Sequence, residues 1–362
     1  MNKPILGITM GDPSGCGPEI TIKALLTDGI YEKCRPLVVG DAAVMEKAAK
    51  ETSGRSDVKI HAVTSIKDCL FKSGTIDVYD LHCVDTTRLQ IGRVDRMSGE
   101  AAFLSVKKVI ELAMAGVIDA TITTPLNKEA LNAAGHHYSG HTEIYADLTD
   151  TKQYSMMLAD GDLRVVHVST HVSLREACDR VKKARVLQVI ELADSACKSL
   201  GIASPRIAVA GLNPHAGENG MFGSEETDEI VPAIAEAKAK GINAGGPIPP
   251  DTVFAKARGG MYDIVVAMYH DQGHIPLKVL GFQYDKQRGK WNAVNGVNIT
   301  LGLPIIRSSV DHGTAFGHAW QGSASESSLL NAIDYGVRLA LNQQPRPEGR
   351  GMLFSRGIAF GV

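Results

Sequence analysis

Short apolar runs alternate with amphipathic stretches along most of the chain. The apolar runs indicate buried strands at Pro4–Met10, Pro36–Val39, Asp119–Thr124, Arg164–Ser169, Arg206–Gly211, Asp263–Met268 and Leu303–Arg307. The amphipathic stretches, with apolar residues three and four apart, predict helices at Glu19–Leu26, Ala42–Lys50, Gly99–Ala115, Ala184–Ser199, Thr227–Lys240 and Ser327–Asn342. Strands that alternate with helices predict an α/β fold with a mostly parallel sheet.

Two segments break this alternation. Gln283–Ala293 is polar and irregular, which predicts a surface loop. Gln343–Val362 is punctuated by Pro, Gly and Arg and has no clear period, so we expect a loosely held tail or an added extension. The whole chain has 362 residues, a length that favours about two domains.

Charge and composition narrow the class of protein. The chain has 38 basic and 40 acidic residues and a formal net charge of −2, which gives no indication of binding to nucleic acid or to an anionic membrane. The sequence contains no apolar run of the ~20 residues that span a bilayer, and Gly11–Pro13 comes too early for a signal-peptide core. The six cysteines include no CxxC pair, as expected of reduced thiols. We therefore expect a cytoplasmic protein.

Polar residues directly follow most of the predicted strands. In open parallel α/β sheets, ligands bind outside the carboxyl ends of the strands. The residues at those ends are Gly11–Gly15, Pro125–Lys128, His171, Asn213–His215, His270–Asp271, Arg307 and Asp311–Thr314. We expect them to gather at one edge of the sheet and to form the functional site.

Three of these strand ends each supply a histidine. His171, His215 and His270 fit a divalent metal site, because neutral imidazole is a common ligand and the ligands of catalytic sites often come from separate elements. Their spacing forms no short motif, so hydrogen-bonded structural histidines are the alternative. Asp251 and Asp271 are the carboxylates that such a metal would add.

The sequence contains no standard nucleotide fingerprint. Gly15–Ile20 resembles GxGxxG but has Ile20 where Gly or Ala is needed, and GxxxxGK[ST] is absent. A strand-to-helix turn with Pro18 near the first helical position explains this segment equally well.

Ser139–Glu143 fits either a capped helix start or part of a site. Arg307 suits bidentate recognition of a phosphate or carboxylate, because its guanidinium is planar and always charged.

Several long motifs resemble one enzyme family. They are GITMGDPSGCGPEI, GHTEIYADLT, GLNPHAGENG, PPDTVF, AMYHDQGHIPLK and GVNITLGLPIIRSSVDHGTA. Together they resemble the 4-hydroxythreonine-4-phosphate dehydrogenase family, over about Ile5 to Asn342. HVSTH, NPHAGENGMFGSEET and YHDQGHIPLK are most similar to the branch that acts on 4-phospho-D-threonate or 4-phospho-D-erythronate.

The resemblance implies two α/β/α domains with a cleft between them, like isocitrate and isopropylmalate dehydrogenases. About residues 1–125 and 300–342 would form the cofactor domain, and about residues 126–299 would supply the metal ligands and the dimer contacts. Residues 343–362 lie outside the family pattern. The implied assembly is a homodimer with its active site at the subunit interface. The family binds NAD without a Rossmann fingerprint, which agrees with its absence here.

The same resemblance assigns roles to individual residues. A divalent metal (Zn, Mg, Mn or Co) would be bound by His171, His215, His270 and, from the partner subunit, Asp251. The substrate positions are His141, Thr142, Lys278, Asn298 and Arg307. The loop around the NAD adenosine is Asp311, His312, Gly313, Thr314 and Ala315. Lys128 is a candidate for proton transfer from its position, and loss of His215 is expected to abolish turnover with the fold intact.

The implied reaction is NAD-dependent oxidation at C3 of a 4-phosphorylated four-carbon hydroxy acid, followed by decarboxylation. From 4-phospho-D-threonate or 4-phospho-D-erythronate the product would be dihydroxyacetone phosphate, in carbohydrate metabolism. A substrate with an amine at C2 would instead give 3-amino-2-oxopropyl phosphate, for pyridoxine biosynthesis. The chain could also be a non-redox metal-dependent sugar-phosphate binder or a metal-dependent phosphohydrolase. It departs from the family pattern at Gln283–Ala293, which is longer, and after Phe316, where it has GHAWQGSASES.

Overall fold

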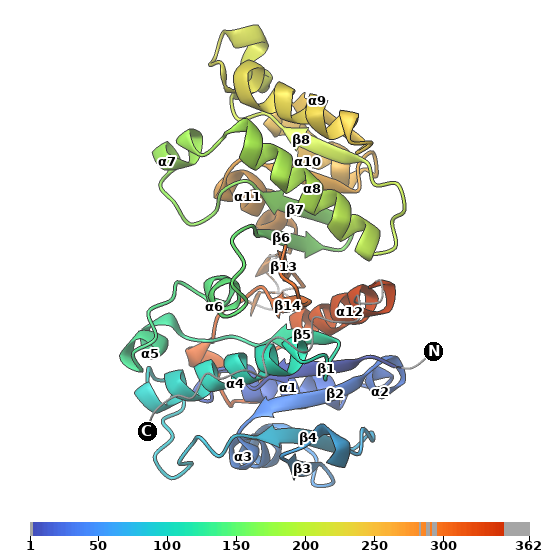
Figure 1. Cartoon of the computed structure of the whole chain (residues 1–362). Helices are drawn as coiled ribbons and strands as arrows, with labels where there is room; N and C mark the ends of the chain where they lie inside the picture. Colours follow the sequence, from blue (N-terminus) through green and yellow to red (C-terminus); the bar gives the residue numbers. More distant parts are fainter. Residues whose placement is uncertain (1–2, 282–283, 287–289, 292–294, 344–362) are drawn as a thin grey trace.

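A single large sheet runs the length of the molecule (Figure 1). The computed structural model describes residues 3–281, 284–286, 290–291 and 295–343. In spatial order, the 12 strands of the sheet are β3 (Lys59–Val63), β4 (Thr75–Asp80), β2 (Arg35–Gly40), β1 (Ile5–Thr9), β5 (Ala120–Thr123), β14 (Arg307–Val310), β13 (Val297–Leu301), β6 (Ser155–Asp160), β7 (Leu163–His167), β10 (Ile264–Ala267), β8 (Ile207–Ala210) and β9 (Ala244–Ile248).

Strand direction changes only in the middle of this sheet. The pairings from β3 to β14 and from β7 to β9 are parallel. The three pairings that connect β14, β13, β6 and β7 are antiparallel. The prediction of a mostly parallel α/β sheet is therefore confirmed.

Helices cover both faces of the sheet. One hydrophobic core is shared by α1 (Gly17–Leu25), α3 (Ala42–Thr52), α8 (Lys183–Ser199), α9 (Val231–Ala239) and α12 (Ser327–Asn342), and it runs along one face through both halves. On the other face, α4 (Arg96–Met114), α5 (Lys128–Ala133) and α6 (His141–Leu148) cover one half, and α10 (Pro250–Arg258) and α11 (His270–Gly281) cover the other. The layers are thus α/β/α throughout.

The remaining elements are short. They are the helices α2 (Ile30–Lys33) and α7 (Leu174–Asp179), the helical turns η1 (Ile66–Asp68), η2 (Pro214–Gly220), η3 (Glu226–Ile230) and η4 (Phe316–His318), and the strand pair β11 (Tyr284–Asp285) and β12 (Lys290–Trp291). No helix in the described part of the chain is long and apolar enough to cross a membrane.

The predicted strand at Leu303–Arg307 is wrong. Residues 302–306 form the turn between β13 and β14, and Arg307 begins a strand instead of ending one. Gly302 has a φ of +89° and Pro304 has no backbone N–H, so this apolar run reverses the chain. Most of the predicted loop at Gln283–Ala293, and residues 344–362 of the predicted tail, lie outside the described residues.

Candidate active site

Arg307 is a buried cation whose recorded hydrogen-bond partners, among the described residues, are all hydroxyl groups. Its side chain is 3% exposed. The guanidinium donates to the hydroxyl of Thr300 at 2.7 Å, of Thr123 at 3.1 Å and of Thr142 at 3.3 Å. Burial lowers the pKa of Arg307 to about 10, and its Nε has no hydrogen-bond partner among the described residues. The carboxylate of Glu143 acts on this charge electrostatically, but no ion pair of Arg307 is recorded among the described residues. A buried charge without a directly paired counterion is costly, so this position is suited to an anionic ligand.

Two further buried polar atoms, one on α6 and one on β13, have no partner in the described structure. His141, the first residue of α6, has a buried Nε2 with no partner in the described structure. Burial and the nearby Arg307 hold the pKa of His141 well below its usual value, so the imidazole is neutral. Asn298, on β13, has a buried Oδ1 that is also unpartnered within the described residues. Because buried polar atoms are normally hydrogen-bonded, these groups together indicate a polar ligand. We call His141, Thr142, Asn298 and Arg307 the anion corner.

Lys278 joins the same region from the other half of the sheet. It lies on α11 and forms an ion pair with Asp311, the residue that directly follows β14. Lys278 is therefore paired with a carboxylate and is not simply a solvated surface lysine. The pair connects the helix that begins at His270 to the predicted cofactor loop.

The predicted cofactor loop packs on the turn after β1. The backbone N–H of Cys16 donates to the carbonyl of Thr314 at 2.9 Å, and the indole of Trp320 donates to the carbonyl of Pro13 at 3.1 Å. Gly15 approaches so closely that an added Cβ would lie 2.9 Å from Thr314. Within Gly15–Ile20 the helix α1 begins at Gly17, with Pro18 in its first turn, as the simpler interpretation of that segment predicted.

Sequence reasoning placed Asp12 at a strand end but gave it no individual role. Its carboxyl is fully buried, its Oδ1 accepts from the backbone of Ser14 at 2.8 Å, and its Oδ2 has no partner in the described structure. Burial raises the pKa of Asp12 to about 7. The motif GDPSG gave only its position at a strand end.

The predicted metal ligands are only partly brought together. The rings of His171 and His270 are tilted by 44° to each other with their centroids 5.7 Å apart, beside a cavity of about 590 Å³. Two imidazoles on one ion have centroids about 5 to 6 Å apart, so this pair fits a shared metal. His215 lies in an exposed turn and Asp251 on the exposed side of α10. Nowhere in the described ranges do three His, Cys, Asp or Glu side chains form a group that could hold a metal ion.

Two histidines that sequence reasoning did not assign to the site lie behind this pair. His274 stacks on His270 with a centroid distance of 3.6 Å, and its Nδ1 bonds to the carbonyl of His270 at 2.9 Å. The buried His167 contacts His274 at 4.7 Å. Burial lowers the pKa of His274 to about 4 and that of His167 to about 3, so both rings are neutral. The i, i+4 spacing of His270 and His274 was the available signal.

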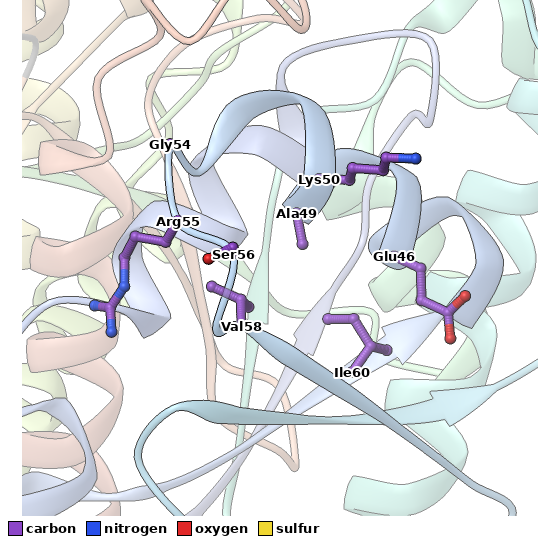
Figure 2. A pocket seen from close by; sticks show the side chains of 8 residues that line it. All are labelled: Glu46, Ala49, Lys50, Gly54, Arg55, Ser56, Val58 and Ile60. Atoms are coloured by element: carbon purple, nitrogen blue, oxygen red, sulfur yellow. The ribbon is translucent and has the colours of Figure 1, made fainter.

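The remaining features are Lys128 and a separate cavity. Lys128 is exposed at the first turn of α5, whose cap is the side chain of Asn127. A cavity of about 670 Å³ lies between α3 and β3, at the far end of the sheet (Figure 2). Figure 2 shows the charged ends of Glu46, Lys50 and Arg55 pointing in different directions, so they form no convergent site.

Comparison with known proteins supplies the family. The family model described as "Pyridoxal phosphate biosynthetic protein PdxA" matches residues 32–336. The chain belongs to the PdxA family. D-threonate 4-phosphate dehydrogenase of Salmonella typhimurium is 48% identical over 94% of this chain and 100% of its own length. D-threonate 4-phosphate dehydrogenase of Cupriavidus necator is 46% identical over 93% of this chain and 97% of its own.

Solved structures of two dehydrogenases share the fold. The crystal structure of 4-hydroxythreonine-4-phosphate dehydrogenase from Klebsiella pneumoniae has a TM-score of 0.82 and 44% identity, and covers 93% of this chain and 100% of that one. A terephthalate 1,2-cis-dihydrodiol dehydrogenase from Burkholderia xenovorans has a TM-score of 0.64 and 29% identity, over 93% and 98% of the two chains. The resemblance inferred from the motifs is confirmed, and the chain is an enzyme of a dehydrogenase family.

Proposed function

We propose that this protein is an NAD-dependent and divalent-metal-dependent dehydrogenase whose substrate is D-threonate 4-phosphate or its C2 epimer, D-erythronate 4-phosphate. The observation that carries the proposal is the anion corner, where the hydrogen bonds of the buried Arg307 go to hydroxyl groups in the described structure. The names of the Salmonella and Cupriavidus relatives supply the substrate class. A 4-phosphorylated acid has two anionic groups, and a buried guanidinium fork matches either one.

The reaction follows from the chemistry of such an acid. The hydroxyl proton and the hydride of C3 leave, which gives a 3-oxo acid and NADH. The C1–C2 bond then breaks, carbon dioxide leaves, and C2 takes up a proton to give dihydroxyacetone phosphate. When bound, a divalent ion would polarise the C3 oxygen and a nicotinamide would accept the hydride.

The residues of the chain would position the substrate and move protons. Arg307 and Thr142 would hold one anionic group, and the neutral His141 and Asn298 would orient the oxygens of the substrate. Lys278 would bind the substrate. Its ion pair with Asp311 would link the substrate to Asp311–Ala315, the loop that would hold the cofactor. Lys128 stays our candidate for proton transfer.

His171, His215 and His270 would hold the ion, with Asp251 of a second subunit. The pairing of His171 with His270 supports this set, and the exposure of His215 and Asp251 leaves both accessible to a partner subunit. We further propose a homodimer of two-domain subunits in the cytoplasm. All six cysteines are free, which is consistent with a reducing compartment.

The substrate is tested by following NADH formation with D-threonate 4-phosphate, D-erythronate 4-phosphate and 4-hydroxythreonine 4-phosphate at equal concentrations. We expect turnover with a 2-hydroxy acid to exceed that with the 2-amino acid. Preference for the amine would move the assignment to 4-hydroxythreonine-4-phosphate dehydrogenase, the name carried by the Klebsiella structure. Binding without any NADH would favour the non-redox binder, and release of phosphate without NADH the phosphohydrolase.

The anion corner is tested by replacing its cation. We expect Arg307→Met to weaken substrate binding by about a hundredfold, since charge-assisted hydrogen bonds are lost. The ligand-free variant should unfold at the same or a higher temperature, because a buried unpaired charge is removed. Arg307→Lys should give an intermediate loss, as lysine keeps the charge but not the fork. Arg206→Met, at an exposed arginine paired with Asp263, is the control. Unchanged binding in Arg307→Met would contradict the assignment.

A further inference from the structure

The turn that carries His215 has an unusual backbone. His215, Ala216, Glu218 and Asn219 have φ values of 53°, 54°, 41° and 56°, and the glycines on either side of Glu218–Asn219 are also left-handed. Residues with a Cβ disfavour this region. A run of this kind persists only where the surrounding structure holds it, and such strain is concentrated at functional sites.

Glu226 holds the base of this turn. Its side chain is buried, and its Oε1 accepts from the backbone N–H groups of Leu212 and Asn213, both at 2.7 Å. Its Oε2 accepts from the side-chain amide of Asn213 at 3.0 Å. Gly217 packs against the same carboxylate, where an added Cβ would lie 2.6 Å from Oε2. One carboxylate therefore fixes both the entry to the turn and its middle.

Gln272 ties this base to the segment that carries His270. The amide Nε2 donates to the carbonyl of Gly211, directly before the turn, at 2.8 Å. Its Oε1 accepts from the backbone N–H of Met268, directly after β10, at 2.6 Å. The side chain is buried, and β8 and β10 are neighbours in the sheet. Gln272 thus links the carboxyl ends of the two strands that lead to His215 and His270.

We propose that Glu226 and Gln272 are positioning residues for the metal site. Neither supplies a ligand. Glu226 fixes the left-handed turn that presents His215, and Gln272 fixes that turn relative to His270. The inference rests on the proposed function, because it takes His215 and His270 as ligands of the ion.

The test compares two adjacent carboxylates in the full-length protein. Glu226→Gln keeps the shape of the side chain but places an NH₂ group where Oε2 faces the Asn213 amide. Glu225→Gln is the matched control, because Glu225 accepts from the same Asn213 amide at 2.8 Å but from no backbone N–H that the described structure records. Mn²⁺ binding is measured by calorimetry without substrate, and hydrogen exchange is followed at Leu212 and Asn213.

We expect Glu226→Gln to weaken Mn²⁺ binding at least tenfold and to speed amide exchange at residues 212–213. The Mn²⁺ concentration for half-activation should rise, whereas kcat at saturating Mn²⁺ stays within about threefold, a separation that mere loss of stability would not give. Glu225→Gln should stay within twofold of the wild type. Equal Mn²⁺ affinity in Glu226→Gln and the wild type, or equal losses in both variants, would overturn the inference.

Two further outcomes are also decisive. If Glu226→Gln does not fold, Gln272→Leu removes the bridge with Glu226 intact, and it must show the same tenfold loss of Mn²⁺ affinity for the inference to hold. If the wild type itself binds no Mn²⁺, the metal site of the proposed function fails. Exchange at residues 212–213 then decides separately whether Glu226 fixes the turn.

Discussion

At the scale of single residues, the site is marked by polar atoms that the fold leaves unsatisfied. The sequence suggested Arg307 because of its polarity near a strand end, whereas our proposal that it binds the substrate rests on its burial among threonine hydroxyls. Burial and hydrogen bonding depend on residues that lie far from Arg307 in the chain, such as Thr123 and Thr142. Residue type and position could therefore be predicted, whereas the burial of Arg307 among hydroxyl partners could not.

His167 gives a prediction about pH at the same scale. Its pKa is about 3 in the folded protein and 6.5 in the unfolded chain, so the unfolded chain binds the extra proton. Its contribution to stability is therefore complete above pH 6.5 and is lost as the pH falls. At pH 5 the cost is about 2 kcal/mol. Asparagine can still donate to the Met156 carbonyl, as Nδ1 of His167 does, but it does not titrate. Between pH 7 and pH 5, the free energy of unfolding of His167→Asn, measured with urea, should therefore fall by about 2 kcal/mol less than that of the wild type. Equal losses would contradict a neutral His167.

At the scale of elements, predictability followed the strength of the local pattern. Ser327–Asn342 is strongly amphipathic, and α12 has those bounds. The strand β9, Ala244–Ile248, forms an edge of the sheet. An edge strand tolerates glycine and proline, so its two glycines and one proline left no strand pattern in the sequence. Leu303–Arg307 shows the opposite error, since an apolar run was taken for a strand where Gly302 and Pro304 turn the chain. Tertiary position decided both cases.

A close helix contact yields the prediction at this scale. At Gly99, α4 approaches α5 so closely that an added Cβ would lie 2.0 Å from the carbonyl oxygen of Ala130. We expect Gly99→Ala to destabilise the protein by about 2 kcal/mol despite the better helix propensity of alanine, because the backbone of α5 must move. Gly245→Ala, where the nearest atom is 4.0 Å from the added Cβ, is the control for thermal unfolding. If Gly99→Ala unfolds at the wild-type temperature, α4 and α5 do not pack as described.

At the scale of the whole molecule, the site combines groups from both halves of one sheet. Arg307 and Asn298 lie on the central strands β14 and β13, whereas His171 and His270 follow β7 and β10. The ion pair of Lys278 with Asp311 connects the two groups. The strand-end rule predicted which residues gather, but it could not show that His171 and His270 meet while His215 stays apart. In the proposed metal site, the third histidine would come from the His215 turn, and Asp251 would come either from the same subunit or from another.

Mixed dimers distinguish these sources. We expect a dimer of one Asp251→Asn subunit and one His215→Ala subunit, isolated by two affinity tags after co-expression, to have about half of the wild-type activity. If Asp251 acts on the site of its partner, one site of this mixed dimer combines an intact histidine set with an intact Asp251. If both groups served the same subunit, each site would lack one of them and the mixed dimer would be inactive.

A second mixed dimer provides the reciprocal control. It pairs a wild-type subunit with one that carries both Asp251→Asn and His215→Ala. If Asp251 acts across the interface, the site with the wild-type histidines receives the Asp251→Asn side chain. The site that receives the wild-type Asp251 carries His215→Ala, so this dimer should be inactive. With Asp251 acting within its own subunit, it should keep half of the activity. The two dimers contain the same substitutions in equal number, so opposite activities can arise only from the arrangement of the subunits.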